Sequence, residues 1–161
     1  MSEWQVRFQG GRSSLNSSPV CILLVEDDPD HAILTIRSLR KAGFEQQIVW
    51  VKDGREALDF MNRRAAYADP AVAPRPDLVL LDLNLPKVDG LSVLEEIKGS
   101  EGLRTIPVVV LTTSQRQDEV KRAYGAGANS YVTKPVQFAD FSEKIRMLGA
   151  YWLSTSSLPG N

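Results

Sequence analysis

Four short, largely apolar segments limit what this 161-residue chain can fold into. They are Val20–Val25, Leu78–Leu81, Val108–Leu111 and Tyr131–Thr133, and they are followed by Glu26, Asp82, Thr112 and Lys134. Uninterrupted apolar segments of this length are typical of strands buried on both faces, as in a parallel sheet that helices cover. We therefore expect an open parallel sheet in which each of these strands ends at a polar side chain.

The polar residues that follow these strands are expected to meet, although they lie far apart in the sequence. In an open parallel sheet the carboxyl ends of the strands line one crevice, at the point where the strand order reverses. Acids, a hydroxyl group and an ammonium group are thus brought to the same edge of the sheet. The sequence predicts a functional site at this edge.

Helix signals follow each strand. Asp28 supplies a capping carboxylate and Pro29 suits the first position of a helix. That helix is predicted to end near Ala42, with Ile33, Ile36 and Leu39 on its inner side. The other expected elements are a strand at 46–51, a helix from a capping box at Asp53 and Glu56 to about Tyr67, a helix at 91–99, a helix from a box-like start at Ser114 to Gly125, a strand at 130–133 and a helix at 137–153. This alternation of strand and helix predicts a doubly wound α/β fold with helices on both faces of the sheet.

The composition fits one folded domain and argues against several classes of protein. Residues 1–19 are expected to form a flexible N-terminal segment, 20–153 the domain and 154–161 a short tail. The 19 basic and 20 acidic residues give a net charge of −1, which argues against a nucleic-acid-binding surface. No segment approaches the roughly 18 apolar residues of a membrane span. The lone cysteine, Cys21, fits a reducing compartment, so we expect a cytoplasmic protein.

Asp82 is the candidate nucleophile of the predicted site, since a carboxylate can attack phosphorus and form an acyl phosphate. The attack requires that the charge on the phosphoryl oxygens be neutralised, usually by Mg²⁺ with oxygen ligands. Glu26 and Asp27 are the candidates to hold this ion together with Asp82, and the backbone carbonyl of Asn84 would complete the coordination. Mg²⁺ is therefore the expected cofactor.

Thr112 and Lys134 suit the phosphoryl group itself, because both can donate hydrogen bonds to its oxygens and the lysine also offsets its charge. Acids at strand ends are sometimes only solvated helix caps, but a hydroxyl and an ammonium group at the ends of other strands favour a site. His31 lies beside Asp30 in the first turn of a helix, and we expect it to be an exposed, hydrated side chain rather than a metal ligand or a phosphoryl carrier.

These segments resemble the receiver domains of two-component response regulators. The matching stretches are Val25–Asp28, Leu80–Gly90, Leu111–Thr113 and Tyr131–Pro135, and the resemblance covers about residues 20–150. It implies a flavodoxin-like fold with strand order 2-1-3-4-5 and phosphorylation of Asp82 by a histidine kinase. It also matches Glu26 and Asp27 to the acidic pair of the family, which leaves Asp28 as the helix cap.

The same resemblance implies how the signal leaves the protein. Thr112 is expected to move toward the phosphoryl group and Tyr131 to turn inward, which remodels the face made by the fourth helix, the fifth strand and the fifth helix. A cis peptide bond is implied between Lys134 and Pro135. The proline-rich loop at 68–76, Leu111–Ser114, Tyr151–Leu153 and Leu158–Pro159 look like single-domain regulators paired with bacterial phytochrome kinases.

The last helix carries more apolar residues than one buried face needs. Its predicted core-facing stripe is Phe138, Phe141, Ile145, Leu148 and Trp152. Met147, Tyr151 and Leu153 fall off this stripe, and Leu158 lies beyond it. An apolar surplus of this kind can mark a partner surface, so we predict a homodimer through residues 136–158.

The main functional prediction is a stand-alone phosphoacceptor switch that signals by protein contact and is not an enzyme beyond its own phosphorylation and dephosphorylation. One alternative is a phosphatase or phosphotransferase of the haloacid-dehalogenase type, which needs an acid two residues after the nucleophile, where this chain has Asn84. Another is a degenerate receiver, but intact Asp27, Asp82, Thr112 and Lys134 argue against it. A DNA-binding regulator is not expected at this length.

Overall fold

A computed structural model describes residues 20–159 and contains a parallel five-stranded sheet. The strands are β1 (Cys21–Val25), β2 (Gln47–Val51), β3 (Leu78–Leu81), β4 (Val108–Thr112) and β5 (Ser130–Thr133). Their order across the sheet is β2-β1-β3-β4-β5. The flavodoxin-like fold and the strand order expected from the sequence are therefore confirmed, whereas the expectation for residues 1–19 lies outside the described part of the chain.

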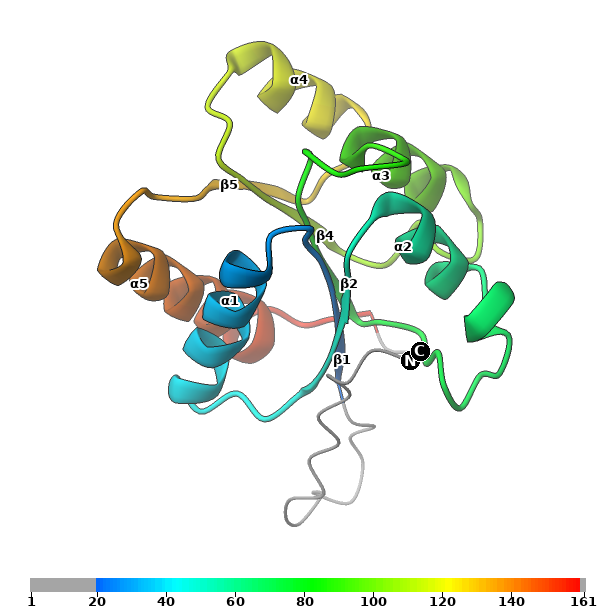
Figure 1. The fold of residues 1–161 in the computed structure, drawn as a ribbon, viewed down its shortest axis with the longest axis horizontal. Helices are drawn as coiled ribbons and strands as arrows, with labels where there is room; N and C mark the ends of the chain where they lie inside the picture. Colours follow the sequence, from blue (N-terminus) through cyan, green and yellow to red (C-terminus); the bar gives the residue numbers. More distant parts are fainter. Residues whose placement is uncertain (1–19, 160–161) are drawn as a thin grey trace.

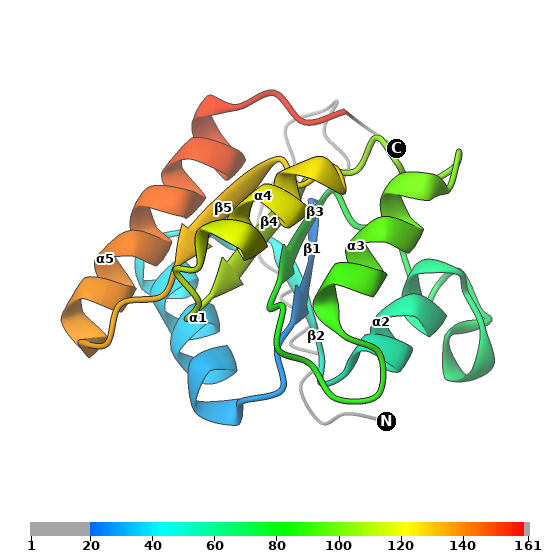
Figure 2. The ribbon, with the colours of Figure 1, turned by 90° about the horizontal axis from the view of Figure 1, so that it is seen from above.

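Helices cover both faces of this sheet (Figures 1 and 2). They are α1 (Pro29–Lys41), α2 (Gly54–Met61), η1 (Ala65–Tyr67), α3 (Gly90–Gly99), α4 (Gln117–Gly125), α5 (Phe138–Gly149) and η2 (Ala150–Thr155). Helices α1 and α5 pack together on one face, and α2, α3 and α4 cover the other (Figure 2). Successive residues of β1 point into opposite cores, so that Ile22 lies in the core under α1 and α5 and Leu23 in the core under the other three helices.

Several helix boundaries differ from the expected ones. The second helix ends at Met61 rather than near Tyr67, because Arg63 takes a left-handed backbone conformation with a φ of 53°. Its capping box is only half formed: the side chain of Asp53 accepts from the backbone N–H of Glu56, but Glu56 accepts from the N–H of Lys52. Helix α4 begins without a side-chain cap, and α5 continues past Gly149 as one π-helical segment.

The packing of α1 on α5 rests on small side chains. The buried residues of α1 are Ala32, Thr35, Ser38 and Leu39. The hydroxyl of Ser38 donates to that of Ser142 on α5 at 3.0 Å, so the two helices approach closely at this point. The prediction of Ile33 on the inner side is wrong for this reason, because small residues line the helix contact and Ile33 is only half-buried.

Helix α5 buries Phe141, Ile145 and Leu148, as expected. Phe138 was predicted to belong to the same stripe, but it is 70% exposed because it is the first residue of the helix and lies beyond the edge of the core. Within residues 20–159, no helix has the length and apolar character needed to cross a bilayer.

The start of α3 has no room for a side chain at Gly90, its first residue. A Cβ atom there would lie 2.2 Å from the carbonyl oxygen of Asp82 and 2.5 Å from the Cα of Leu83. The substitution Gly90→Ala is expected to lower the free energy of unfolding by about 2 kcal/mol or more, since backbone atoms must move apart. Chemical denaturation followed by circular dichroism measures this change.

Gly125→Ala is the matched control, because a Cβ at Gly125 meets no atom within 4 Å. It is expected to raise the free energy of unfolding by roughly 0.5–1 kcal/mol, because alanine stabilises a helix more than glycine does. Equal effects of the two substitutions would contradict the close approach at Gly90.

Candidate functional site

The carboxyl edge of the sheet brings the predicted residues together through strand register. Val25 of β1 pairs with Leu81 of β3, so the residues that follow, Glu26 and Asp82, leave adjacent strands side by side. The backbone N–H of Asp82 donates to the carbonyl of Val25 at 3.0 Å. On the other side of the site, the backbone N–H of Lys134 donates to the carbonyl of Thr112 at 2.7 Å.

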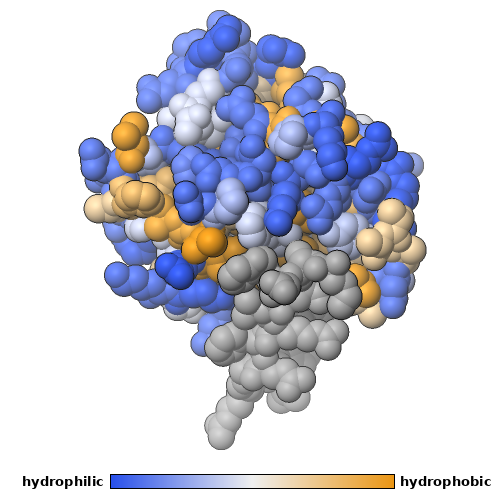
Figure 3. Space-filling model, in the orientation of Figure 1, coloured by the Kyte–Doolittle hydropathy of each residue, from blue (hydrophilic) through white to orange (hydrophobic). Residues whose placement is uncertain are grey.

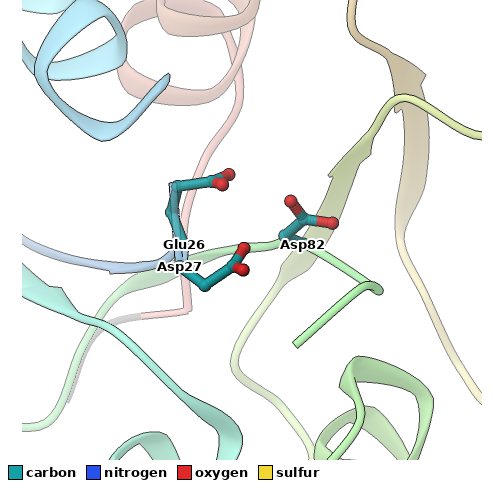
Figure 4. A group of neighbouring side chains, drawn as sticks. All are labelled: Glu26, Asp27 and Asp82. Atoms are coloured by element: carbon teal, nitrogen blue, oxygen red, sulfur yellow. The ribbon is translucent and has the colours of Figure 1, made fainter. Parts of the chain in front are cut away.

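Three carboxylates meet at this edge (Figure 4). One oxygen each from Glu26, Asp27 and Asp82 lies within 4.8 Å of the others. Glu26 and Asp82 are buried and Asp27 is exposed, so the group opens to solvent on the side of Asp27. Asp28 caps α1 as expected, since its side chain accepts from the backbone N–H groups of Asp30 and His31.

Lys134 forms ion pairs with both buried acids. Its Nζ lies 2.5 Å from Oε2 of Glu26 and 3.0 Å from Oδ2 of Asp82, and its side chain is only 1% exposed. A buried charge without a partner is strongly unfavourable, whereas a charge with close, hydrogen-bonded partners is tolerated. This ion-pair network therefore holds β1, β3 and the segment after β5 together.

The pKa of Glu26 reflects this crowding. Burial and the neighbouring charge of Asp82 raise the pKa of Glu26 from an ordinary value of 4.5 to about 7, although Lys134 acts in the opposite direction. The backbone of Glu26 is fixed as well, because the indole N–H of Trp50 on β2 donates to its carbonyl oxygen at 2.8 Å. The side chain of Trp50 is buried beside the site.

The other predicted residues lie around the three carboxylates. The backbone N–H of Asn84 donates to Oδ1 of Asp82 at 3.0 Å, which ties the following turn to that carboxylate. Thr112 is fully buried at the end of β4, and its hydroxyl oxygen faces the N–H of Ser114 at 3.4 Å. The hydroxyl of Tyr131 donates to the carbonyl of Ser114 at 3.0 Å, and its ring is partly buried.

Sequence reasoning missed His31. We expected an exposed and hydrated side chain, but Nδ1 of His31 lies 3.2 Å from Nζ of Lys134, and the side chain is only 34% exposed. The signal that was available is positional: α1 begins directly after β1, so its first turn lies at the same edge as the strand ends. The prediction of a cis bond before Pro135 is also wrong, since the bond is trans, the isomer that X–Pro bonds generally favour.

Comparison with known proteins assigns the chain to a family. Residues 22–146 match the response regulator receiver domain, and the chain belongs to this family. The match does not support the haloacid-dehalogenase alternative, and it agrees with a carboxyl edge that gathers acids, a threonine and a lysine.

The relatives of the chain include regulators from archaea and cyanobacteria. The probable methanogenesis regulatory protein FilR2 of Methanothrix harundinacea is 46% identical over 142 residues, which cover 88% of this chain and 89% of that protein. The response regulator Rcp1 of Synechocystis is 39% identical over 147 residues, which cover 91% of this chain and 98% of Rcp1.

Solved structures of such regulators resemble the fold closely. The Mn²⁺-bound form of Rcp1 has a TM-score of 0.83 and 39% identity, with 88% of this chain and 100% of that one covered. The phosphorylated cyanobacterial phytochrome response regulator RcpA has a TM-score of 0.84 and 39% identity, with 89% of this chain and 100% of that one covered.

The raised pKa of Glu26 makes stability depend on pH. Between its ordinary pKa of 4.5 and the folded value of about 7, the folded chain holds more protons on Glu26 than the unfolded chain does. The contribution of Glu26 to the free energy of unfolding in metal-free buffer is therefore expected to fall as pH rises through this window. Denaturation of wild type and Glu26→Gln across the window measures it, and the wild type should show the steeper decline.

Glu95→Gln, which removes an exposed carboxylate of α3, serves as the control for a general charge effect. Its decline with pH should match that of the wild type. If Glu26→Gln also matched the wild type, the raised pKa assigned to Glu26 would be wrong.

Proposed function

We propose that the protein is a phosphoacceptor switch in which Asp82 takes a phosphoryl group from the phosphohistidine of a kinase. A carboxylate oxygen of Asp82 forms a bond to phosphorus as the P–N bond of the kinase breaks, and the electron pair of that bond stays on the imidazole nitrogen. The observation that carries the proposal is the position of Asp82, whose carboxylate lies beside those of Glu26 and Asp27 and pairs with the buried ammonium group of Lys134.

The proposed metal ligands are Glu26, Asp27, Asp82 and the backbone carbonyl of Asn84. The close approach of three carboxylate oxygens fits a hard divalent cation such as Mg²⁺, which prefers oxygen ligands. The Mn²⁺-bound form of Rcp1 supports this assignment by similarity. When bound, the cation supplies positive charge against the phosphoryl oxygens during their transfer.

Lys134 and Thr112 are proposed to donate hydrogen bonds to the phosphoryl oxygens. Lys134 already donates to Oδ2 of Asp82, so it needs only a small movement to donate to an oxygen of a phosphoryl group attached there. Thr112 ends the neighbouring strand β4 with a hydroxyl that is fully buried. A threonine hydroxyl can donate to a phosphoryl oxygen once its side chain turns toward Asp82.

Tyr131 is proposed to couple this movement of Thr112 to the surface. Both residues are linked to Ser114: Thr112 through the hydroxyl that faces the N–H of Ser114, and Tyr131 through the bond that it donates to the Ser114 carbonyl. A shift of Thr112 therefore changes the position of the loop that holds the ring of Tyr131. The remodelled surface would consist of α4, β5 and α5, whose change is a shift between two packings.

A histidine kinase is the proposed phosphoryl donor, and a bacterial phytochrome is the proposed sensor. The similarity to RcpA, described as a phytochrome response regulator, supports the second step. We infer that the protein acts in the cytoplasm, where a kinase takes its phosphate from ATP. The site is proposed to act as a signalling module that catalyses only its own phosphorylation and dephosphorylation.

A homodimer through residues 136–158 is proposed from exposed apolar side chains. Val136 is 97% exposed, Phe138 70%, Met147 59% and Tyr151 55%. In Figure 3 hydrophobic atoms gather at the left of the view, where α5 lies in Figure 1, while most of the visible face is hydrophilic. Apolar side chains concentrated on one helix and its flanking residues are typical of an association surface.

Replacement of the nucleophile tests the main proposal. Incubation of the wild type with Mg²⁺ and acetyl phosphate is expected to add one phosphoryl group, and Asp82→Asn should show no adduct because an amide oxygen is a far weaker nucleophile. Intact-mass spectrometry measures both. Asp89→Asn, on an exposed helix cap, is the control and should be labelled at the wild-type rate. Labelling of Asp82→Asn at the wild-type rate would refute the assignment.

The dimer proposal predicts a mass that depends on Phe138. Light scattering at micromolar concentration is expected to give a dimeric mass for the wild type and a monomeric mass for Phe138→Lys, because a buried, unpaired ammonium group opposes association. Val72→Lys changes an exposed apolar residue in the loop at 68–76 and should leave the dimer intact. A monomeric wild type, both with and without phosphorylation, would exclude the dimer.

A further inference from the structure

His31 occupies a position that the proposed phosphoryl transfer leaves without a role. Its imidazole lies at the edge of the site, with Nδ1 3.2 Å from Nζ of Lys134 and Nε2 3.7 Å from Oδ2 of Asp28. The ring of Phe141 lies next to it, with 5.9 Å between the ring centroids. His31 thus links the lysine of the site to the cap of α1 and to the buried side of α5.

The donors and acceptors available to Lys134 decide which atom donates in its contact with His31. An ammonium group has three N–H donors and no acceptor. The three atoms near Nζ are Oε2 of Glu26, Oδ2 of Asp82 and Nδ1 of His31, one for each donor. Because Nζ can only donate, a hydrogen bond between these two atoms has Nδ1 as its acceptor and requires the tautomer with the imidazole proton on Nε2, on the side of Asp28.

Two contacts fix the backbone of His31, and a third limits its ring. The carboxylate of Asp28 accepts from the backbone N–H of His31, so the first turn of α1 is fixed by its own cap. The hydroxyl of Thr35, which is buried, donates to the backbone carbonyl of His31 at 2.8 Å. Phe141, only 3% exposed, limits the ring on the side of α5.

The three partners of Lys134 differ in what happens to them during the proposed reaction. Asp82 becomes an acyl phosphate, and Glu26 is a proposed metal ligand, so both change their charge or their partners. His31 is the one partner of this ammonium group, within residues 20–159, whose chemistry stays the same. It can therefore keep one donor of Lys134 in place while the others exchange carboxylate oxygens for phosphoryl oxygens.

We propose that His31 is a positioning residue. It accepts a hydrogen bond from Lys134 and thereby keeps the ammonium group where it can donate to a phosphoryl group on Asp82. This inference rests on the proposed function, since it concerns the same lysine. It assigns His31 no contact with the phosphoryl group or the metal. The competing explanation is purely structural, in which His31 only fills space between α1 and Phe141.

A mutant cycle separates these explanations. His31→Leu keeps a side chain against Phe141 but removes the acceptor, and His31→Asn places an amide oxygen near the position of Nδ1. Each is made in the wild type and with Lys134→Met, which keeps the buried stem and removes the ammonium group. The rate constant of phosphorylation by acetyl phosphate with Mg²⁺ is measured by intact mass, and thermal unfolding checks that every variant is folded.

We expect His31→Leu to slow phosphorylation about tenfold and His31→Asn to stay within about twofold of the wild type, since a hydrogen bond to a charged group is lost only in the first. In the Lys134→Met background, His31→Leu should cause no further loss, because the residue through which it acts is absent. A wild-type rate for His31→Leu, or the same loss in both backgrounds, would overturn the proposal.

A second measurement is independent of the rate. In protein labelled with ¹⁵N-lysine, the Nζ resonance of Lys134 is assigned by its disappearance in Lys134→Met. It should shift in His31→Leu and stay near its wild-type position in His31→Asn, and an unchanged resonance in His31→Leu would contradict the hydrogen bond. Failure of the wild type itself to take up phosphate would instead refute the proposed function, so the two failures are distinct.

Discussion

The structure depends on one buried ammonium group. A parallel sheet with this register forces Glu26 and Asp82 to lie side by side at the ends of adjacent strands, where two buried carboxylates repel each other. Lys134 makes that arrangement tolerable, because it donates to both acids from a segment more than fifty residues further along the chain. The strands that carry the acids and the segment after β5 are thus held by the same interaction that prepares the site for a phosphoryl group.

Most of the sheet and the acidic part of the site could be predicted from the sequence, and the reason is physical. Strands buried on both faces must be apolar throughout, so β1, β3 and β4 are visible as uninterrupted segments, and the residues after them must lie at one edge. The prediction that Glu26, Asp27 and Asp82 come together therefore needed no knowledge of side-chain packing. Asp28 as the cap of α1 was equally visible, because capping depends on local sequence alone.

The features that the sequence did not predict depend on how helices face one another. Hydrophobic periodicity placed Ile33 inside, but the contact of α1 with α5 is lined by small residues such as Ala32 and Ser38. The same orientation of α1 about its axis brings His31 next to Lys134, and no local sequence pattern predicts this orientation. Phe138 fits the spacing of the buried stripe, but its place at the end of the helix leaves it in solvent.

The contact of Trp50 with Glu26 has a consequence for how this site can be observed. The indole N–H of Trp50 donates to the backbone carbonyl of Glu26, whose carboxyl group has the raised pKa, and Trp50 is only 5% exposed. An indole in this position is a chromophore whose emission responds to nearby charge and to small backbone displacements. The protein therefore contains an optical reporter bonded to the backbone of its acidic pair, on a strand that β1 separates from the strand of Asp82.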